Sequence, residues 1–285
     1  MVKKRIEDYF NTLNQKIFLK KDLDRILTAK RYSWKLRETI NTENFITLLK
    51  ENQLKEIKLP SPHYEKTYTR FSWGDEVSIY QLGLSLKSHS YLSHYTAMYL
   101  NGLTDQVSKT IYVNSEQSPK PYRNVSLGQE RIDNAFNGKS RTSKYIFNYG
   151  EWNICILSGK NTNNLGVEKV KRSKNETLSV TNIERTLIDI AVRPVYSGGI
   201  NKVQMVYQRA KDKISVKKLV AMLKKINYVY PYHQVIGFYM QRASFDESAL
   251  DLLKKMDLKY DFYLDYKMKK KKYTKEWRLY YPNNL

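Results

Sequence analysis

The sequence predicts an α+β protein, made of a small helical module closed by a β-hairpin and a larger mixed α/β domain. Residues 1–73 hold three apolar patterns at helical spacing followed by two short alternating stretches. In residues 74–285, strand-like runs come before a series of helical patterns, which is typical of the α+β class. Trp73-Gly74-Asp75 breaks the pattern between the two parts, and we place the domain boundary there.

Apolar spacing predicts the helices of the first module, over residues 3–13, 20–28 and 42–53. In the first helix, Ile6, Phe10 and Leu13 fall three and four residues apart and form one apolar stripe. In the third, Phe45 and Leu49 point inward in the same way. Each of these segments therefore has one face that must pack against a neighbour.

Two strands are expected over residues 54–59 and 66–73, around the turn Pro60-Ser61-Pro62-His63. Three helices followed by a hairpin is the order of a winged helix-turn-helix, whose third helix enters the major groove of DNA. Lys66, Tyr68 and Arg70 alternate along the second strand and give the hairpin a basic, aromatic face. A helical bundle with a solvated basic surface is the alternative, but it does not account for the hairpin.

The third helix is the expected DNA reader because its outer face and its start are polar. Asn41 or Thr42 can cap this helix by accepting a hydrogen bond from a free backbone N–H. Side chains of this kind suit contact with base edges and phosphates. The candidates for the groove are Asn41, Thr42, Asn44, Thr47 and Lys50, and the candidates for phosphates are Lys35, Arg37, Lys66 and Arg70. Since one module covers a short half-site, we expect two copies on an operator inverted repeat.

The charge of the chain favours a nucleic-acid partner. Its 285 residues hold 50 Lys and Arg against 28 Asp and Glu, a formal net charge of +22. Residues 1–72 hold 16 basic and 9 acidic side chains, residues 73–142 hold 7 and 6, and residues 143–285 hold 27 and 13. A field of this sign attracts phosphate backbones. An AT-rich genome would explain the preference for Lys over Arg, but not the excess over acids.

Composition also excludes some classes. The single cysteine, Cys155, rules out an internal disulfide and a multi-cysteine zinc site. No apolar run is long enough to cross a bilayer, and the N-terminus lacks the apolar core of a signal peptide. We therefore expect a cytoplasmic protein without a membrane partner.

Alternating and helical patterns continue through the larger domain. Strands are expected over residues 110–114, 144–148, 152–157, 167–171, 178–180, 259–266 and 276–281. Helices are expected over residues 77–86, 93–100, 127–136, 182–192, 200–211, 216–225, 234–242 and 247–254.

Two blocks of this domain carry a family resemblance. Residues 92–106 read LSHYTAMYLNGLTDQ, followed by TIYV at 110–113. Residues 181–189 read TNIERTLID, followed by Arg193-Pro194 and Gly198-Gly199-Ile200. These blocks look like the signature of AbiEi-type antitoxins, and the similarity spans nearly the whole chain in order. The family belongs to abortive-infection, type IV toxin–antitoxin systems and joins an N-terminal winged helix-turn-helix to a C-terminal antitoxin domain.

The resemblance implies two activities. Members of that family repress their own operon through inverted repeats. They also counteract a partner nucleotidyltransferase toxin in phage defence, without needing a stable complex with it. We expect both activities here, with DNA and the toxin as partners. The segments 114–124 and 267–275 match no pattern of the family, so their roles stay open.

Elementary chemistry gives the two blocks mainly structural roles. His94 follows Ser93, a good helix cap, and is expected to pack or hydrogen-bond. Glu184 and Arg185 could form an internal ion pair, and Asp189 with Arg193 has the spacing of a helical i, i+4 pair. A functional surface at these positions is the alternative.

The densest charge run covers residues 267–275. It is either a solvated, mobile hairpin tip, or a second phosphate site that grips DNA beside the recognition helix, or a site for the RNA substrate of the toxin. Within it, the candidate DNA contacts are Lys269, Lys270, Lys271 and Lys272.

The enzyme hypothesis is a sequence-specific endonuclease or a restriction-modification accessory protein. Glu56-Ile57-Lys58 and Asp257-Leu258-Lys259 have the acid-x-Lys spacing of such nucleases, but triplets of this kind are expected by chance among so many lysines. The four histidines are scattered, and no phosphate-binding glycine loop occurs. We expect no enzyme, cofactor or metal; cutting of plasmid DNA in the presence of Mg²⁺ would favour the nuclease.

Overall fold

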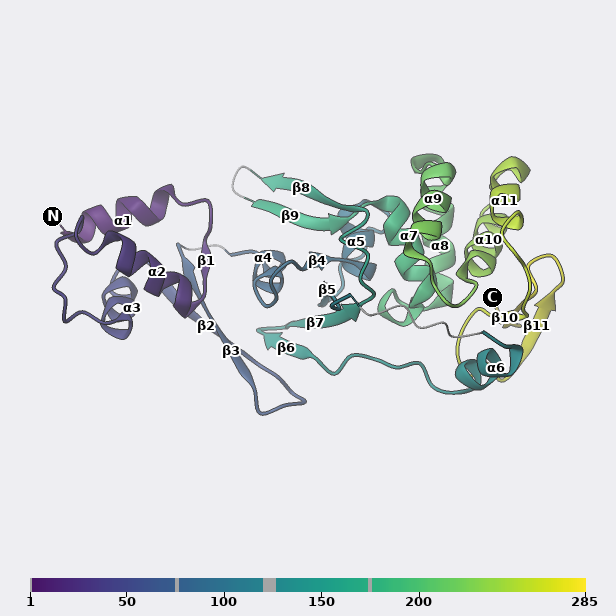
Figure 1. Cartoon of the computed structure of the whole chain (residues 1–285), viewed down its shortest axis with the longest axis horizontal. Helices are drawn as coiled ribbons and strands as arrows, with labels where there is room; N and C mark the ends of the chain where they lie inside the picture. Colours follow the sequence, from purple (N-terminus) through teal and green to yellow (C-terminus); the bar gives the residue numbers. More distant parts are fainter. Residues whose placement is uncertain (1, 75–76, 120–126, 174–175) are drawn as a thin grey trace.

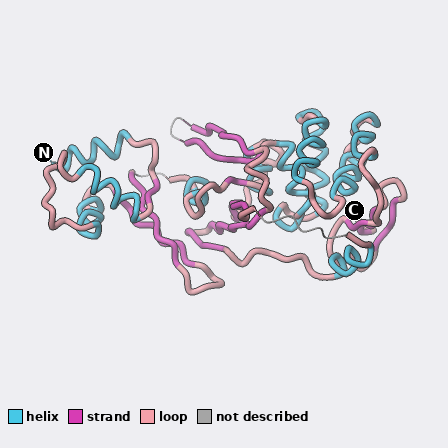
Figure 2. Tube along the Cα trace, viewed as in Figure 1, coloured by secondary structure: helices cyan, strands magenta, loops and turns pink. Residues whose placement is uncertain are grey.

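A computed structural model describes residues 2–74, 77–119, 127–173 and 176–285. The molecule is elongated, with the N-terminal module at one end, a sheet in the middle and a group of helices at the other end (Figure 1). Helices gather at both ends and most strands lie between them (Figure 2). The predicted α+β class is confirmed.

The first module consists of three helices and a small antiparallel sheet with strand order β1-β3-β2. The helices are α1 (Val2–Thr12), α2 (Lys20–Lys30) and α3 (Thr42–Lys50), and the strands are β1 (Ile17–Phe18), β2 (Leu54–Pro60) and β3 (Thr67–Trp73). The predicted helices and hairpin lie where the sequence places them, but β1 was not predicted because two residues show no alternation. Phe10 of α1 stacks on Trp73 of β3 and so joins a helix to the sheet, while Trp34 stacks on Phe45 of α3.

A six-stranded mixed sheet forms the middle of the molecule, in the order β6-β7-β5-β4-β9-β8. Its strands are β4 (Tyr91–Leu92), β5 (Thr110–Glu116), β6 (Ile146–Tyr149), β7 (Trp152–Gly159), β8 (Val167–Ser173) and β9 (Glu176–Thr181). The central strands β5 and β7 run parallel, with Ser115 opposite Ser158 at their carboxyl ends. The short helices α4 (Ile79–Leu84) and α5 (His94–Leu100) connect to this sheet.

The far end of the molecule is mostly helical, with one small sheet. Its helices are α6 (Gln129–Asn137), α7 (Ile183–Val192), α8 (Ile200–Ala210), α9 (Val216–Ile226), α10 (Tyr232–Arg242) and α11 (Glu247–Lys254). The strands β10 (Phe262–Tyr263), β11 (Lys271–Thr274) and β12 (Leu279–Pro282) pair in the order β10-β12-β11. Gly237 lets Trp277 approach α10, since a Cβ there would lie 2.1 Å from the indole ring.

The second half of the lysine-rich run forms the strand β11, and its lysines are exposed. Lys271 pairs with Pro282 across β11 and β12, and its ammonium lies 4.8 and 4.5 Å from the ring centres of Tyr263 and Tyr280. Tyrosines on the neighbouring strands thus stabilise a charged segment by cation–π contact. The run is therefore solvated, as one of the three interpretations expected, but residues 271–274 pair with β12 instead of forming a free tip.

The hairpin β2–β3 belongs to two hydrophobic cores. Leu54 and Trp73, at its base, are buried among the helices of the first module. Ile57 and Leu59, further along, are buried in the cluster that covers the six-stranded sheet. Tyr68 packs on Phe147 of β6, with 4.8 Å between ring centres. The predicted boundary at Trp73 therefore lies between the last strand of the first module and the first helix of the larger part. The hairpin β2–β3 nevertheless contributes side chains to the hydrophobic cores of both parts.

Arg70 fastens the hairpin to the rest of the molecule. Its side chain is 4% exposed, and it donates hydrogen bonds to the carbonyl oxygen of Ser85, from Nε at 3.1 Å and from Nη2 at 2.9 Å. Ser85 is the C-cap of α4, where free carbonyls and the helix dipole favour a cation. The prediction that Arg70 contacts DNA phosphates is therefore wrong, because the basic face of the hairpin is turned onto α4 and β6.

We predict that Arg70→Met lowers the free energy of unfolding by about 2 kcal/mol, since it leaves the carbonyl of Ser85 without a charged donor. Urea denaturation followed by tryptophan fluorescence measures this, because Trp34 and Trp73 lie in the first module. Lys66→Met is the matched control. Lys66 is exposed immediately before β3, so we expect the free energy of unfolding to change by less than about 0.5 kcal/mol. Equal midpoints for R70M and the wild type would contradict this role.

Candidate functional site

Helix α3 is held so that one face looks away from the molecule. Phe45, Ile46 and Leu49 are buried in the core of the first module. The side-chain oxygen of Asn41 accepts a hydrogen bond from the backbone N–H of Asn44 at 2.9 Å. The capped start predicted for this helix is confirmed, with Asn41 rather than Thr42 as the cap.

The outer face of α3 combines exposed polar groups with neutralised charges. Asn44 and Thr47 are exposed and line a shallow hollow of about 420 Å³. The carboxylates of Glu43 and Glu51 are each paired with a lysine, Lys20 in the first case and Lys3 in the second. The acidic residues of this face therefore carry their own counter-charges and oppose an approaching phosphate less than bare carboxylates would.

Three candidates on α3 are engaged within the protein. The hydroxyl of Thr47 donates to the backbone carbonyl oxygen of Glu43 on the same helix at 3.1 Å. Lys50 forms an ion pair with Glu56 of β2, and the hydroxyl of Thr42 bonds to the carboxylate of Asp24. The ion pair lowers the pKa of Glu56. Contact of Lys50 with a base would first require this exposed pair to open, which costs little because such pairs contribute about 0–1 kcal/mol.

The loop between α2 and α3 carries the predicted phosphate contacts Lys35 and Arg37. Both are exposed, and neither makes a side-chain hydrogen bond or ion pair with the residues that the structure describes. Arg31 organises this loop by donating to the carbonyl oxygens of Arg37 at 2.6 Å and Ile40 at 2.8 Å. Sequence reasoning missed Arg31, because a single arginine at a helix end has no distinctive pattern.

The structure brings together part of the predicted set and separates the rest. Seven candidates lie on α3 or just before it: Lys35, Arg37, Asn41, Thr42, Asn44, Thr47 and Lys50. Lys66 lies near the tip of the hairpin, over the ring of Tyr68, and the hairpin extends away from α3 (Figure 1). Lys269, Lys270, Lys271 and Lys272 lie at the opposite end of the molecule (Figure 1). The lysine run therefore does not lie beside α3.

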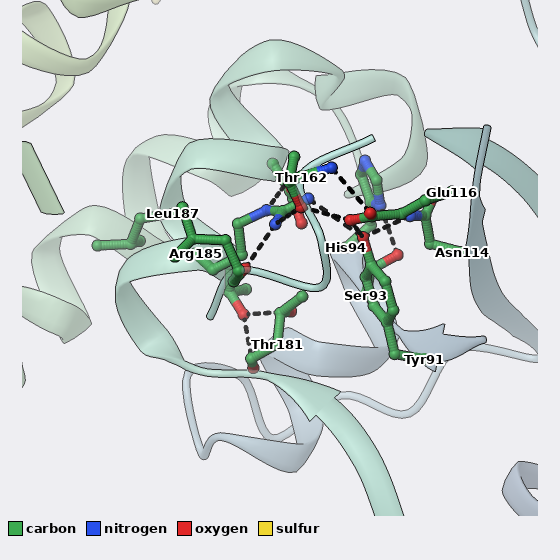
Figure 3. A network of polar contacts seen from close by, with 12 residues as sticks. Tyr91, Ser93, His94, Asn114, Glu116, Thr162, Thr181, Arg185 and Leu187 are labelled. Atoms are coloured by element: carbon green, nitrogen blue, oxygen red, sulfur yellow. Dashed lines mark hydrogen bonds and ion pairs between the residues drawn. The ribbon is translucent and has the colours of Figure 1, made fainter. Parts of the chain in front are cut away.

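A second cluster of polar residues lies inside the body, around Arg185 (Figure 3). Its guanidinium donates to Asp189 Oδ1 at 2.9 Å, to the carbonyl oxygen of Leu165 at 2.6 Å and to the hydroxyl of Thr162 at 3.0 Å. Arg185 and Asp189 are almost fully buried, with side chains 4% and 7% exposed. The two predicted ion pairs, Glu184 with Arg185 and Asp189 with Arg193, are therefore wrong. Glu184 pairs instead with Lys218 at 3.3 Å. Arg193 is exposed and lies over the ring of Tyr196.

Glu116 closes this network on the sheet side. It accepts hydrogen bonds from the backbone N–H of Thr162 at 2.8 Å and of Asn164 at 3.3 Å, and from the hydroxyl of Tyr91 at 3.0 Å. Burial raises the pKa of Glu116, but these hydrogen bonds outweigh burial and hold the pKa below its usual value. Burial raises the pKa of Tyr91, so its phenol stays neutral and can donate. The network thus joins β4, β5, the loop before β8 and α7.

His94 is a structural residue, as its place beside Ser93 predicts. Its ring is 7% exposed, its Nδ1 lies 2.9 Å from the hydroxyl of Ser93, and it meets Tyr196 edge to face. Burial lowers the pKa of His94 to about 4. The imidazole ring of His94 is therefore neutral at pH 7.

In residues 2–74, 77–119, 127–173 and 176–285, no group of three histidine, cysteine, aspartate or glutamate side chains is placed to hold a metal ion. No helix within those ranges has the length and apolar character to span a membrane.

Comparison with known proteins identifies a fold neighbour but no family. No family model matches the chain, and no curated protein matches it. Among solved structures, it is similar to the crystal structure of the RV2827C protein from Mycobacterium tuberculosis, with a TM-score of 0.59 and 12% sequence identity. The match covers 98% of this chain and 90% of that one. At this identity the likeness shows that the two chains share a fold over nearly their whole length.

We predict that His94 makes the protein less stable in mild acid. Because its pKa of about 4 in the folded protein lies below that of an unfolded histidine, near 6.5, the unfolded chain binds more protons as the pH falls through this window. His94 should therefore cost about 2 kcal/mol of stability between pH 7 and about pH 5.

His94→Asn isolates this effect, because asparagine tolerates the φ of 51° at this position. Urea denaturation at both pH values should show a smaller acid loss in H94N than in the wild type. Burial also lowers the pKa of His233. Because His233 is present in both proteins, its contribution to the acid-induced loss of stability is the same in each and cancels in the comparison. Parallel stability losses in the two proteins would show that His94 is not the group that titrates.

Proposed function

We propose that the N-terminal module is a winged helix-turn-helix that binds duplex DNA through α3, and that the protein represses its own operon. The observation that carries this proposal is the outer face of α3. Asn44 and Thr47 are exposed there, and Lys35 and Arg37 stand free in the preceding loop. Amide and hydroxyl side chains read base edges, and unpaired cations bind phosphates. Two copies on an inverted repeat would supply the specificity that one short half-site lacks.

The second part of the proposal is an antitoxin role against a nucleotidyltransferase toxin. Its support is the resemblance of residues 92–106 and 181–189 to AbiEi-type antitoxins. In the structure many of these residues are buried, including Ser93, His94, Arg185 and Asp189. We therefore assign these blocks to holding the domain together, and expect any surface that opposes a toxin to lie outside them.

We predict that Asn44→Ala combined with Thr47→Ala weakens binding to the duplex upstream of the protein's own coding sequence by about tenfold or more. Both side chains are exposed, so their removal should leave the fold intact. Fluorescence anisotropy at fixed salt measures the Kd. Asn201→Ala, an exposed change on α8, is the control and should bind like the wild type. Unchanged affinity in N44A/T47A would remove this face of α3 from the DNA site.

The same double variant separates the two proposed activities. Co-expressed with a nucleotidyltransferase from the neighbouring reading frame, it should still restore growth while no longer repressing a reporter. A loss of both activities in a protein with wild-type melting temperature would mean that neutralisation needs the DNA-binding face.

We further predict that Lys35→Gln combined with Arg37→Gln flattens the salt dependence of DNA binding. Each phosphate contact contributes about 0.9 to the slope of log Kd against log salt, so two lost contacts lower the slope by about 2. Lys269→Gln combined with Lys272→Gln makes the same charge change at the other end of the molecule and should leave the slope unaltered. Equal flattening by both pairs would show that general charge, rather than the loop before α3, determines binding.

A further inference from the structure

A cavity of about 570 Å³ lies between the hairpin and the carboxyl ends of the parallel strands β5 and β7. Ser115 and Ser158, which lie opposite each other on these strands, line the cavity on the sheet side. Lys66 and Tyr68 line it on the hairpin side. In sheets with parallel strands, ligands bind in the crevice outside the carboxyl ends. The volume is in the range of small-molecule sites and well beyond what inorganic phosphate alone would fill.

The lining is strongly cationic. Lys66, Lys87, Arg141 and Arg193 reach the cavity from four different segments of the chain. All four are exposed, and none forms an ion pair with a residue that the structure describes. Because these four positive charges line one cavity without ion-pair partners, an anion in the cavity would be attracted by all of them.

Glu116, the one carboxylate among the described residues of the lining, does not oppose an anion effectively. Glu116 already accepts hydrogen bonds from the backbone N–H of Thr162 and Asn164 and from Tyr91. The oxygens of Glu116 are thus occupied by donors of the buried network around Arg185. The four cations therefore dominate the electrostatic field in the cavity.

The cavity also offers an aromatic surface and hydroxyl groups. Tyr145 is 51% exposed and is held by stacking on Tyr64 of the hairpin turn, with 5.3 Å between ring centres. The hydroxyls of Ser118 and Thr142 line the same space. Stacking on an aromatic ring suits a nucleobase, hydroxyls suit a ribose, and cations suit phosphates.

We propose that this cavity binds a mononucleotide, with its phosphates among the four cations and its base against Tyr145. This site is distinct from the DNA-binding face of α3 and does not depend on it. Because the cavity is bounded by the hairpin and by β5 and β7, a bound nucleotide would bridge the two parts of the molecule.

Isothermal titration calorimetry of the full-length protein with ATP, GTP, adenosine and inorganic phosphate tests this. We expect ATP or GTP to bind at least tenfold more tightly than adenosine or phosphate. Arg141→Gln combined with Arg193→Gln should weaken nucleotide binding at least tenfold. Lys224→Gln combined with Lys225→Gln, the same charge change on exposed positions of α9, should leave it unaltered. Tyr145→Ala should weaken nucleotide binding several-fold while leaving phosphate binding unchanged.

Melting temperatures of all variants should equal that of the wild type, because the altered side chains are exposed. Three results would overturn the proposal. They are no binding of either nucleotide at millimolar concentration, equal weakening by the R141Q/R193Q and K224Q/K225Q pairs, and loss of duplex DNA binding in R141Q/R193Q with nucleotide binding intact. The last result would assign these cations to the DNA backbone instead.

Discussion

The hydrogen bonds between Arg70 and the carbonyl of Ser85 determine how the two parts of this molecule are joined. They fix β3 against the end of α4 while Ile57 and Leu59 bury the neighbouring strand in the core of the sheet. A rotation of the first module would expose these apolar side chains and leave a buried guanidinium without partners, which is expensive. The hairpin is therefore a structural bridge, and α3 is presented on a module with a defined orientation.

This constraint divides the basic residues of the chain into groups with different roles. Arg70 and Arg185 are buried and hold elements together through carbonyl and carboxylate partners. Lys35 and Arg37 lie just before α3 without a side-chain hydrogen bond or ion pair to any described residue, and they suit phosphate contact. Arg141 and Arg193 line the cavity beside the hairpin, also without an ion pair to a described residue. The net charge alone gives no hint of this division, because each role depends on what the fold places next to the guanidinium or ammonium group.

Local patterns predicted most elements because the information for them is local. The helices of the first module, the hairpin and the cap at Asn41 follow from spacing and from one hydrogen-bonding side chain. The two-residue strands β1 and β4 could not be predicted, because their strand character comes only from pairing with distant residues. The strand β11 was missed for a related reason: its lysines are exposed, and its strand character comes from pairing with β12 and from the rings of Tyr263 and Tyr280 beside Lys271.

The choice between possible side-chain partners also could not be predicted from the sequence. The i, i+4 rule allows both Arg185 with Asp189 and Asp189 with Arg193, and only the fold decides between them by burying the first pair. Likewise, alternation placed Lys66, Tyr68 and Arg70 on one face of a strand but could not show that α4 and β6 cover that face. Candidate contacts on α3 could be named because they needed only helical periodicity.

Amide hydrogen–deuterium exchange of the full-length protein, with and without the duplex upstream of its coding sequence, tests the central claim most directly. If α3 enters the groove, the amides of residues 35–50 should exchange more slowly in the complex, while those of residues 267–275 should not change. Protection confined to the far end of the molecule, with residues 35–50 unaffected, would contradict the account.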